Sequence, residues 1–153
     1  MPDTPIAATG GCLCGAIRYE ARIFARSAYV CHCTKCQKST GQPFEIGVPV
    51  LAGTLRWTKG EPASYLAMPN GRRMFCPTCA ARLAWVPTDP KEDWTTNVDP
   101  CGLDDPSVVR TMEHIFIDTR QPWFEIADDL PRYTEDQMDM VSARWHAERV
   151  RSA

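Results

Sequence analysis

The chain has 153 residues, of which 44% are hydrophobic and 24% charged, values that are typical of a globular domain and exclude extended disorder or a fibrous protein. Its 17 Lys and Arg against 19 Asp and Glu give no positive surplus for a nucleic-acid backbone. No apolar run reaches the roughly 20 residues that span a membrane, and no basic segment followed by an apolar stretch opens the chain. We therefore expect one cytoplasmic domain over residues 1–153, with neither a nucleic-acid nor a membrane partner.

Short β-rich segments between glycines and prolines predict a mainly β fold. Strands are expected at residues 10–20, 27–33, 44–51, 54–58, 64–68, 73–75, 82–86 and 114–117. Ala52-Gly53 indicates a tight reversal between two of these strands. Asn70-Gly71 is the strongest hairpin signal in the sequence. The 13 Pro and nine Gly interrupt the chain too often for long helices in this region.

One helix is predicted at the end of the chain, over about residues 135–150. Thr134 and Gln137 have the spacing of a capping box at its start. Met138, Val141 and Trp145 then form one apolar stripe, which favours a helix packed on the sheet over a helix that binds a partner.

Cysteine is the unusual component of the sequence. Seven of its eight cysteines fall into three groups: Cys12 and Cys14; Cys31, Cys33 and Cys36; and Cys76 and Cys79. A disulfide framework needs an oxidising compartment, and cysteines one or two residues apart are poorly placed to pair with each other. Metal binding is therefore the better explanation.

The first and third groups together predict a closed zinc site. Cys12 and Cys14 would present two thiols on one face of an extended strand, with Leu13 on the other face. Cys76 and Cys79 have the spacing of a zinc knuckle. Four thiolates leave no position for a substrate, so we expect this site to stabilise the fold.

The middle group predicts a second, reactive zinc site. Cys31, Cys33 and Cys36 would supply three thiolates and leave a fourth position open. A closed site is the alternative, with Cys101 or a histidine as fourth ligand. His32 would point away from its two neighbours in a strand, so a packing or hydrogen-bonding role is favoured for it. The remaining two histidines, at positions 114 and 146, are expected in core or surface positions, and Cys101 as a spare thiol in a turn.

The cysteine motifs resemble those of a known family. The segments Gly11-Cys12-Leu13-Cys14-Gly15, residues 31–41 (CHCTKCQKSTG) and Phe75-Cys76-Pro77-Thr78-Cys79 look like those of the glutathione-dependent formaldehyde-activating enzymes, which include centromere protein V-like proteins. The resemblance extends over about residues 10–133. It implies an Mss4-like β fold with two zinc ions, in which Cys12, Cys14, Cys76 and Cys79 hold the structural zinc and Cys31, Cys33 and Cys36 the active-site zinc. Ala80 stands where relatives usually have Gly, which implies a different or mildly strained knuckle turn.

The resemblance implies a zinc-dependent carbon–sulfur lyase of the S-(hydroxymethyl)glutathione synthase type, in which a small thiol such as glutathione is activated and adds to formaldehyde. Cationic side chains near the cysteines could bind its anionic groups, although each is also typical of solvated surface charge: Lys35, Lys38, Arg72 and Arg73. Two other functions stay open. One is a non-catalytic thiol-binding or interaction module, and the other is a redox protein that uses Cys101.

Overall fold

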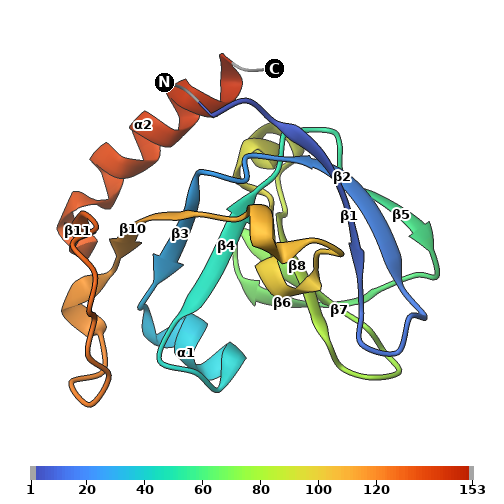
Figure 1. Ribbon diagram of the computed structural model, residues 1–153, viewed down its shortest axis with the longest axis horizontal. Helices are drawn as coiled ribbons and strands as arrows, with labels where there is room; N and C mark the ends of the chain where they lie inside the picture. Colours follow the sequence, from blue (N-terminus) through green and yellow to red (C-terminus); the bar gives the residue numbers. More distant parts are fainter. Residues whose placement is uncertain (1–2, 152–153) are drawn as a thin grey trace.

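The structure, a computed structural model, describes residues 3–151, so the predicted domain of residues 1–153 extends beyond the described part at both ends. Its strands and α-helices follow in chain order as β1 (Ile6–Gly11), β2 (Arg18–Ile23), β3 (Ala28–Cys31), α1 (Thr34–Thr40), β4 (Glu45–Pro49), β5 (Arg56–Lys59), β6 (Ala63–Met68), β7 (Gly71–Phe75), β8 (Arg82–Pro87), β9 (Asn97–Val98), β10 (Thr111–Ile115), β11 (Arg132–Tyr133) and α2 (Met138–Val150) (Figure 1). The predicted mainly β fold with a C-terminal helix is confirmed. Neither helix of residues 3–151 is long and apolar enough to cross a bilayer.

The strands form two sheets. A three-stranded antiparallel sheet has the order β1-β2-β5, and an eight-stranded sheet has the order β11-β10-β3-β4-β9-β8-β7-β6. Within the larger sheet, β10 runs parallel to both β3 and β11, whereas the other pairs are antiparallel. Isolated bridges from Gly10 to Leu103 and from Ile23 to Val50 join the smaller sheet to the rest of the molecule.

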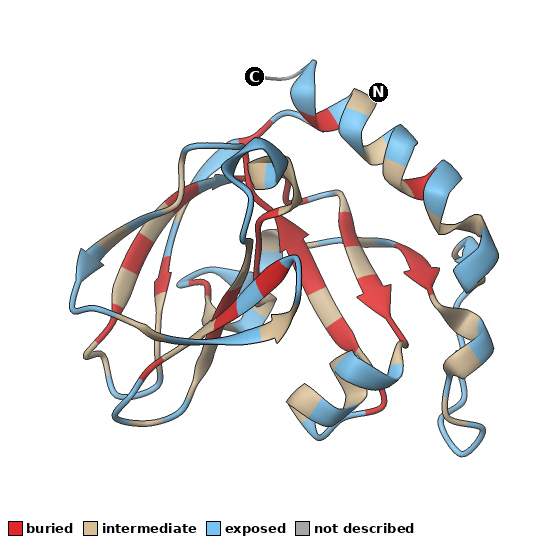
Figure 2. Cartoon of the chain, turned by 180° about the vertical axis from the view of Figure 1, so that it is seen from behind, coloured by how far each residue is buried: buried red, intermediate tan, exposed pale blue. Residues whose placement is uncertain are grey.

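The main core lies where the two sheets meet. Tyr19, Ala21 and Ile23 alternate along β2 and are all buried, as the period of two in a strand requires. They pack in one cluster with side chains of the larger sheet such as Val48 and Leu83. Figure 2 shows buried residues along the strands of both sheets, whereas most of α2 is exposed or half-buried.

Helix α2 covers a second, smaller core. The predicted capping box of Thr134 and Gln137 is present, and it opens a short 3₁₀ turn that leads into α2. Val141 is buried against Cys31 and Ile115, and Met138 and Trp145 pack around the same cluster. The predicted apolar stripe therefore does pack on the sheet, and it does so beside β3, whose last residue is Cys31 of the middle cysteine group.

The structure departs from the expected strands in several places, and the short strands β9 and β11 were not expected. Residues 54–58 were expected to follow residues 44–51 after a reversal, but β5 pairs with β2 and not with β4. A separate strand, β1, precedes the Cys12 turn, and the short helix α1 follows Cys33. Strand partners distant in sequence leave no local signal, and a helix of seven residues is too short to show a clear period.

The predicted hairpin at Asn70-Gly71 is confirmed, because β6 and β7 pair directly around it. An Asn-Gly motif suggests that the glycine is needed for a positive φ in the turn, but Gly71 is needed for a different reason. Gly71 does not have a positive φ, but a Cβ atom there would lie 2.0 Å from a ring carbon of Trp85 on β8. The close approach of the indole ring, and not the turn type, excludes a side chain at this position.

We predict that Gly71→Ala lowers the free energy of unfolding by about 1–3 kcal/mol, because the added methyl group overlaps the Trp85 ring. Urea denaturation followed by circular dichroism measures this change. Asn70→Ala, in the exposed turn, is the control and should have a small effect. Trp85→Leu combined with Gly71→Ala should relieve the overlap, so an additive loss in the double variant would contradict this explanation.

Candidate metal centres

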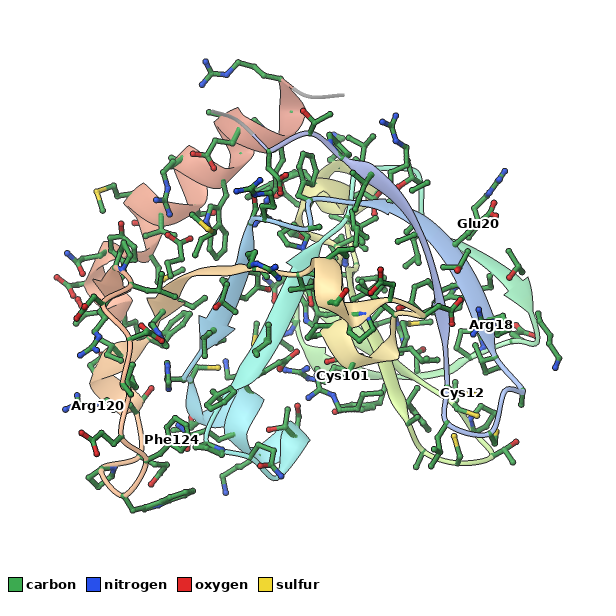
Figure 3. The ribbon with its side chains drawn as sticks, in the orientation of Figure 1. Cys12, Arg18, Glu20, Cys101, Arg120 and Phe124 are labelled. Atoms are coloured by element: carbon green, nitrogen blue, oxygen red, sulfur yellow. The ribbon has the colours of Figure 1, made fainter. Side chains whose placement is uncertain are left out.

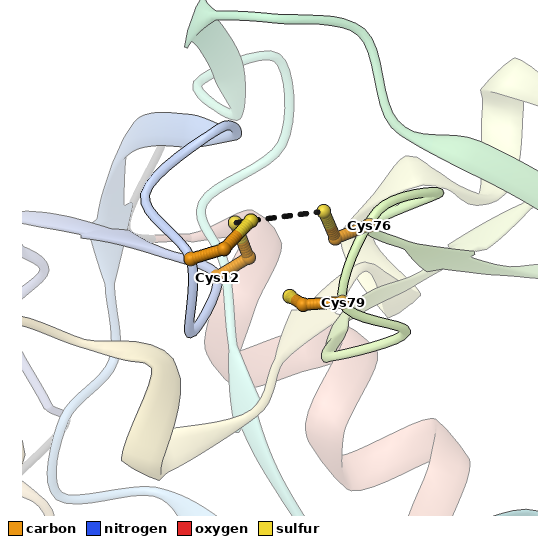
Figure 4. Close-up of side chains that lie close together, drawn as sticks. Cys12, Cys76 and Cys79 are labelled. Carbon is orange, nitrogen blue, oxygen red and sulfur yellow. Dashed lines mark hydrogen bonds between the residues drawn. The ribbon is translucent and has the colours of Figure 1, made fainter.

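Four sulfur atoms from two distant turns form the first cluster (Figure 4). Cys12 and Cys14 lie in the turn between β1 and β2, and Cys76 and Cys79 lie in the turn between β7 and β8. The Cys14 Sγ is 3.6 Å from that of Cys12 and 3.8 Å from that of Cys76, and all four sulfurs lie within 4.8 Å of one another. Sulfurs bound tetrahedrally to zinc at about 2.3 Å would be about 3.8 Å apart, so this donor set fits a zinc ion.

The Cys12 and Cys14 pair converges for a reason other than the one expected. The two residues do not lie in an extended strand. They belong to a turn, in which the Gly15 N–H donates to the Cys12 carbonyl oxygen at 3.2 Å. Leu13 at the tip of this turn is 88% exposed. Burial would raise the pKa of Cys12, but the backbone N–H of Ile17, 3.2 Å from its sulfur, and the neighbouring thiols hold it lower, at about 6.

The knuckle turn that carries Cys76 and Cys79 contains a strained residue. Ala80 has a φ of 60°, in the left-handed region that favours glycine. The Ala80 N–H donates to the Cys76 carbonyl oxygen at 2.9 Å, and the Cys76 N–H donates to the Ala81 carbonyl oxygen at 2.9 Å. The turn therefore has the backbone conformation that glycine usually adopts, although residue 80 is alanine.

Three sulfur atoms from one short segment form the second cluster. Cys31 ends β3, Cys33 is the N-cap of α1, and Cys36 lies in the first turn of α1, with all three sulfurs within 4.8 Å of one another. Cys33 was expected in a strand beside Cys31. Instead, its sulfur accepts a hydrogen bond from the Cys36 N–H at 3.3 Å, as an N-cap side chain does.

The three thiols of the second cluster differ in how easily they ionise. Hydrogen bonds from Cys31 and Cys36, together with backbone N–H groups at the start of α1, lower the pKa of Cys33. Interaction with Cys33 raises the pKa of Cys31, and interaction with Cys31 and Cys33 together with burial raises the pKa of Cys36. Three thiolates can therefore coexist here only if positive charge is close by.

No fourth His, Cys, Asp or Glu side chain joins this cluster within residues 3–151. His32 lies between two of the cysteines but turns away from them, as expected from strand geometry. Its Nε2 is 2.8 Å from Nδ1 of His114 on β10. Cys101 is exposed in a turn outside both clusters, and His146 is exposed on α2 with its ring against Trp94.

The pair of histidines is a feature that the sequence analysis missed. His32 and His114 are both buried and stacked, and Nε2 of His114 lies 3.1 Å from the carboxylate of Asp128 near the surface. Burial, followed by the charge of His114, lowers the pKa of His32 to about 4. The contact depends on the parallel pairing of β3 with β10, which joins residues more than 80 positions apart.

The four candidate cations near the cysteines have different surroundings. Lys35 and Lys38 on α1 and Arg72 on β7 are exposed, but Arg73 is only 8% exposed. Arg73 Nη2 donates to Cys36 Sγ at 3.5 Å. The expectation that each of these cations is a solvated surface charge is therefore met by three of the four residues, but not by Arg73.

The segment after β10 borders the second cluster. The Gln37 side chain on α1 donates to the carbonyl oxygens of His32 and Thr119, at 2.6 and 2.9 Å. The Phe44 ring contacts both His32 and Phe124. In Figure 3, Arg120 and Phe124 lie on the opposite side of the molecule from Cys12. The two clusters therefore have separate surroundings.

This segment also lines a shallow cleft. Its volume is about 390 Å³, and its walls are formed by Arg120, Pro122, Phe124, Glu125, Ile126 and Arg132. Arg120 and Arg132 donate to backbone carbonyl oxygens, at 3.4 Å to Ile117 and 2.7 Å to Asp128. The cleft thus brings cationic and aromatic side chains together.

The fold and the two clusters define a mainly β protein with two candidate sites for a thiophilic metal ion. The chain belongs to the family of glutathione-dependent formaldehyde-activating enzymes, whose family model matches residues 7–119. A search of curated proteins found no match. A crystal structure of a Rhodobacter sphaeroides protein is similar, with a TM-score of 0.52 and 19% identity over 82% of this chain and 99% of that protein. At this identity the likeness shows the fold alone.

We predict that Ala80→Gly raises the free energy of unfolding by up to about 1 kcal/mol, because glycine adopts the positive φ of the knuckle turn without strain. Urea denaturation of the metal-loaded protein measures the change. Ala81→Gly, at the next position and without a positive φ, is the matched control and should lower stability. Equal losses in both variants would show that the Ala80 turn carries no strain.

Proposed function

We propose that the protein binds one zinc ion in each cluster and joins a small thiol, glutathione or a close relative, to formaldehyde. This makes it a carbon–sulfur lyase of the S-(hydroxymethyl)glutathione synthase type. The observation that carries the proposal is the second cluster, in which three sulfurs converge and no fourth protein donor joins them within residues 3–151. Membership of a family named for glutathione-dependent activation of formaldehyde supports the same substrates.

The two clusters suit different roles. In the first, four sulfurs join turns that are more than 60 residues apart, so a metal ion there would cross-link the β1–β2 turn to the β7–β8 turn and stabilise the fold. The second draws its three sulfurs from one short segment, and a tetrahedral zinc ion held by three protein ligands would keep its fourth position for an exogenous ligand. A reducing compartment such as the cytoplasm would keep all seven thiols available.

The reaction needs a thiol whose proton is easily lost. Zinc bound by Cys31, Cys33 and Cys36 would lower the pKa of a thiol that approaches it. The thiol sulfur forms a bond to the carbon of formaldehyde, the carbonyl π bond breaks, and the proton that the thiol lost ends on the new hydroxyl oxygen. No oxidant or reductant takes part.

The chain offers a surface for the anionic groups of a glutathione-like thiol. We propose that its carboxylates bind in the cleft that Arg120 and Arg132 line, because guanidinium groups match carboxylates in charge and geometry. Phe124 in the same cleft contacts Phe44, whose ring contacts His32, the residue between Cys31 and Cys33. Aromatic contacts therefore run from the cleft to His32, which is next in sequence to two cysteines of the second cluster.

We predict two zinc ions per chain, one of which exchanges or is lost during dialysis against excess glutathione. Cys36→Ser should lower the zinc content by about one equivalent and leave the circular dichroism spectrum unchanged, because Cys36 belongs to the cluster that lies on one segment. Cys79→Ser in the first cluster is the matched variant and should lower stability as well as zinc content. Unfolding of Cys36→Ser would contradict the division into a structural and a reactive site.

We further predict that the zinc-loaded protein accelerates the formation of S-(hydroxymethyl)glutathione from glutathione and formaldehyde. Exchange NMR at equilibrium measures this rate, and the uncatalysed reaction is the reference. Cys36→Ser should abolish the acceleration. Saturable glutathione binding without acceleration would instead support a non-catalytic thiol-binding module. Cys101→Ser should leave the rate unchanged, because Cys101 lies outside both clusters.

A further inference from the structure

A buried arginine lies against the second cluster. Arg73 on β7 is 8% exposed, and its Nη2 lies 3.5 Å from the Cys36 sulfur. Within residues 3–151, it is the only cationic side chain that donates a hydrogen bond to a sulfur of this cluster. The neighbouring Arg72 is exposed and lies 3.4 Å from the Ser64 hydroxyl group. Alternation along β7 thus turns one arginine toward the cluster and the other to solvent.

A chain of alternating charges holds Arg73 in this position. Its Nη1 donates to Glu45 on β4 at 2.9 Å, and the other Glu45 carboxylate oxygen lies 2.8 Å from the same nitrogen. Arg82 on β8 donates to Glu45 at 2.7 Å and lies 3.2 Å from Asp99. The buried Glu45 carboxylate thus lies between two arginines, and its Oε1 accepts a hydrogen bond from each of them.

The formal charges show what Arg73 changes. Three thiolates and one divalent cation carry a net charge of −1, so a further thiolate would bring the cluster to −2 in a partly buried place. The repulsion between these negative charges is strong, because they are close together and salt screens partly buried charges only weakly. Arg73 contributes +1 within hydrogen-bonding distance of a cluster sulfur, and Arg73 and Arg82 together outweigh the single negative charge of Glu45, so the three side chains add +1 in sum beside the cluster. A neutral ligand adds no charge to the cluster, so it does not need this compensation.

We propose that Arg73 is a positioning residue that balances the charge of the three-cysteine cluster and so allows an anionic sulfur to bind there in preference to a neutral ligand. The inference rests on the proposed function, because it requires a thiol at the second cluster. It assigns to Glu45 and Arg82 the role of holding Arg73 against Cys36.

Ligand binding to the cobalt-loaded protein tests this role without an activity measurement. Glutathione, 2-mercaptoethanol and imidazole serve as two thiols and one neutral probe, and the visible absorption of cobalt reports their binding. We expect Arg73→Met to weaken the binding of both thiols by about tenfold and to leave imidazole binding unchanged. Arg73→Lys should recover part of the thiol affinity, because lysine restores the positive charge but lacks the planar, two-pronged guanidinium group. The matched control Arg72→Met should bind all three probes as the wild type does.

Removal of Arg73 alone leaves Glu45 with one partner fewer in a buried place, which can prevent folding. The double variant Arg73→Met/Glu45→Gln removes both members of the ion pair and keeps the test valid. Because this variant loses one positive and one negative charge together, it should show a smaller loss of thiol binding than Arg73→Met, again with imidazole binding unchanged, since the hydrogen bond to Cys36 is still removed.

The result that overturns the inference is an equal loss for thiols and imidazole, or no loss for either, in a folded variant that lacks Arg73. Absence of thiol binding in the wild-type protein would overturn the proposed function together with this inference. Normal wild-type thiol binding that does not depend on Arg73 would overturn the inference alone.

Discussion

Sulfur atoms that lie within a few ångströms of one another cannot all carry negative charge unless positive charge is close to them. This constraint governs the second cluster. Cys33 ionises easily at the start of α1, but the same contacts raise the pKa values of Cys31 and Cys36. Three thiolates in this cluster would therefore require a cation, and Arg73 supplies part of the positive charge from the protein itself. Arg73 in turn pairs with the buried Glu45 on β4, which also binds the half-buried Arg82 on β8, since a buried arginine needs an anionic partner.

The sequence predicts those features whose signal is local. Three groups of cysteines at short spacing identify both clusters, the capping box at Thr134 locates the start of the C-terminal helix, and Asn70-Gly71 marks a hairpin. Each depends on residues a few positions apart. The metal and the substrate remain predictions, because sulfur ligands are common to several metals and thiols.

Features that depend on pairing between distant segments could not be predicted. The contact of His32 with His114 requires β3 beside β10, and β5 joins the smaller sheet although β4 precedes it. Arg73 illustrates the same limit. In the sequence it is one of two adjacent arginines with the same prior for solvent exposure, and only the register of β7 with β8 decides which of them is buried. The turn at Cys12 shows that the convergence of two thiols can be predicted from an incorrect local conformation, because a strand places residues i and i+2 on one face and a tight turn also brings them together.

The two clusters are connected through β7. Arg73 lies three residues before Cys76, and both belong to the β7–β8 hairpin. A metal ion in the first cluster would fix the end of this hairpin against the β1–β2 turn, since its four sulfurs come from both turns. The same hairpin carries Arg73 and Arg82, which reach Glu45 on β4 and thereby the second cluster. A metal ion in the first cluster would thus do more than stabilise the fold. By holding the β7–β8 hairpin in register, it would also hold the positive charge against Cys36 on which the chemistry of the second cluster depends.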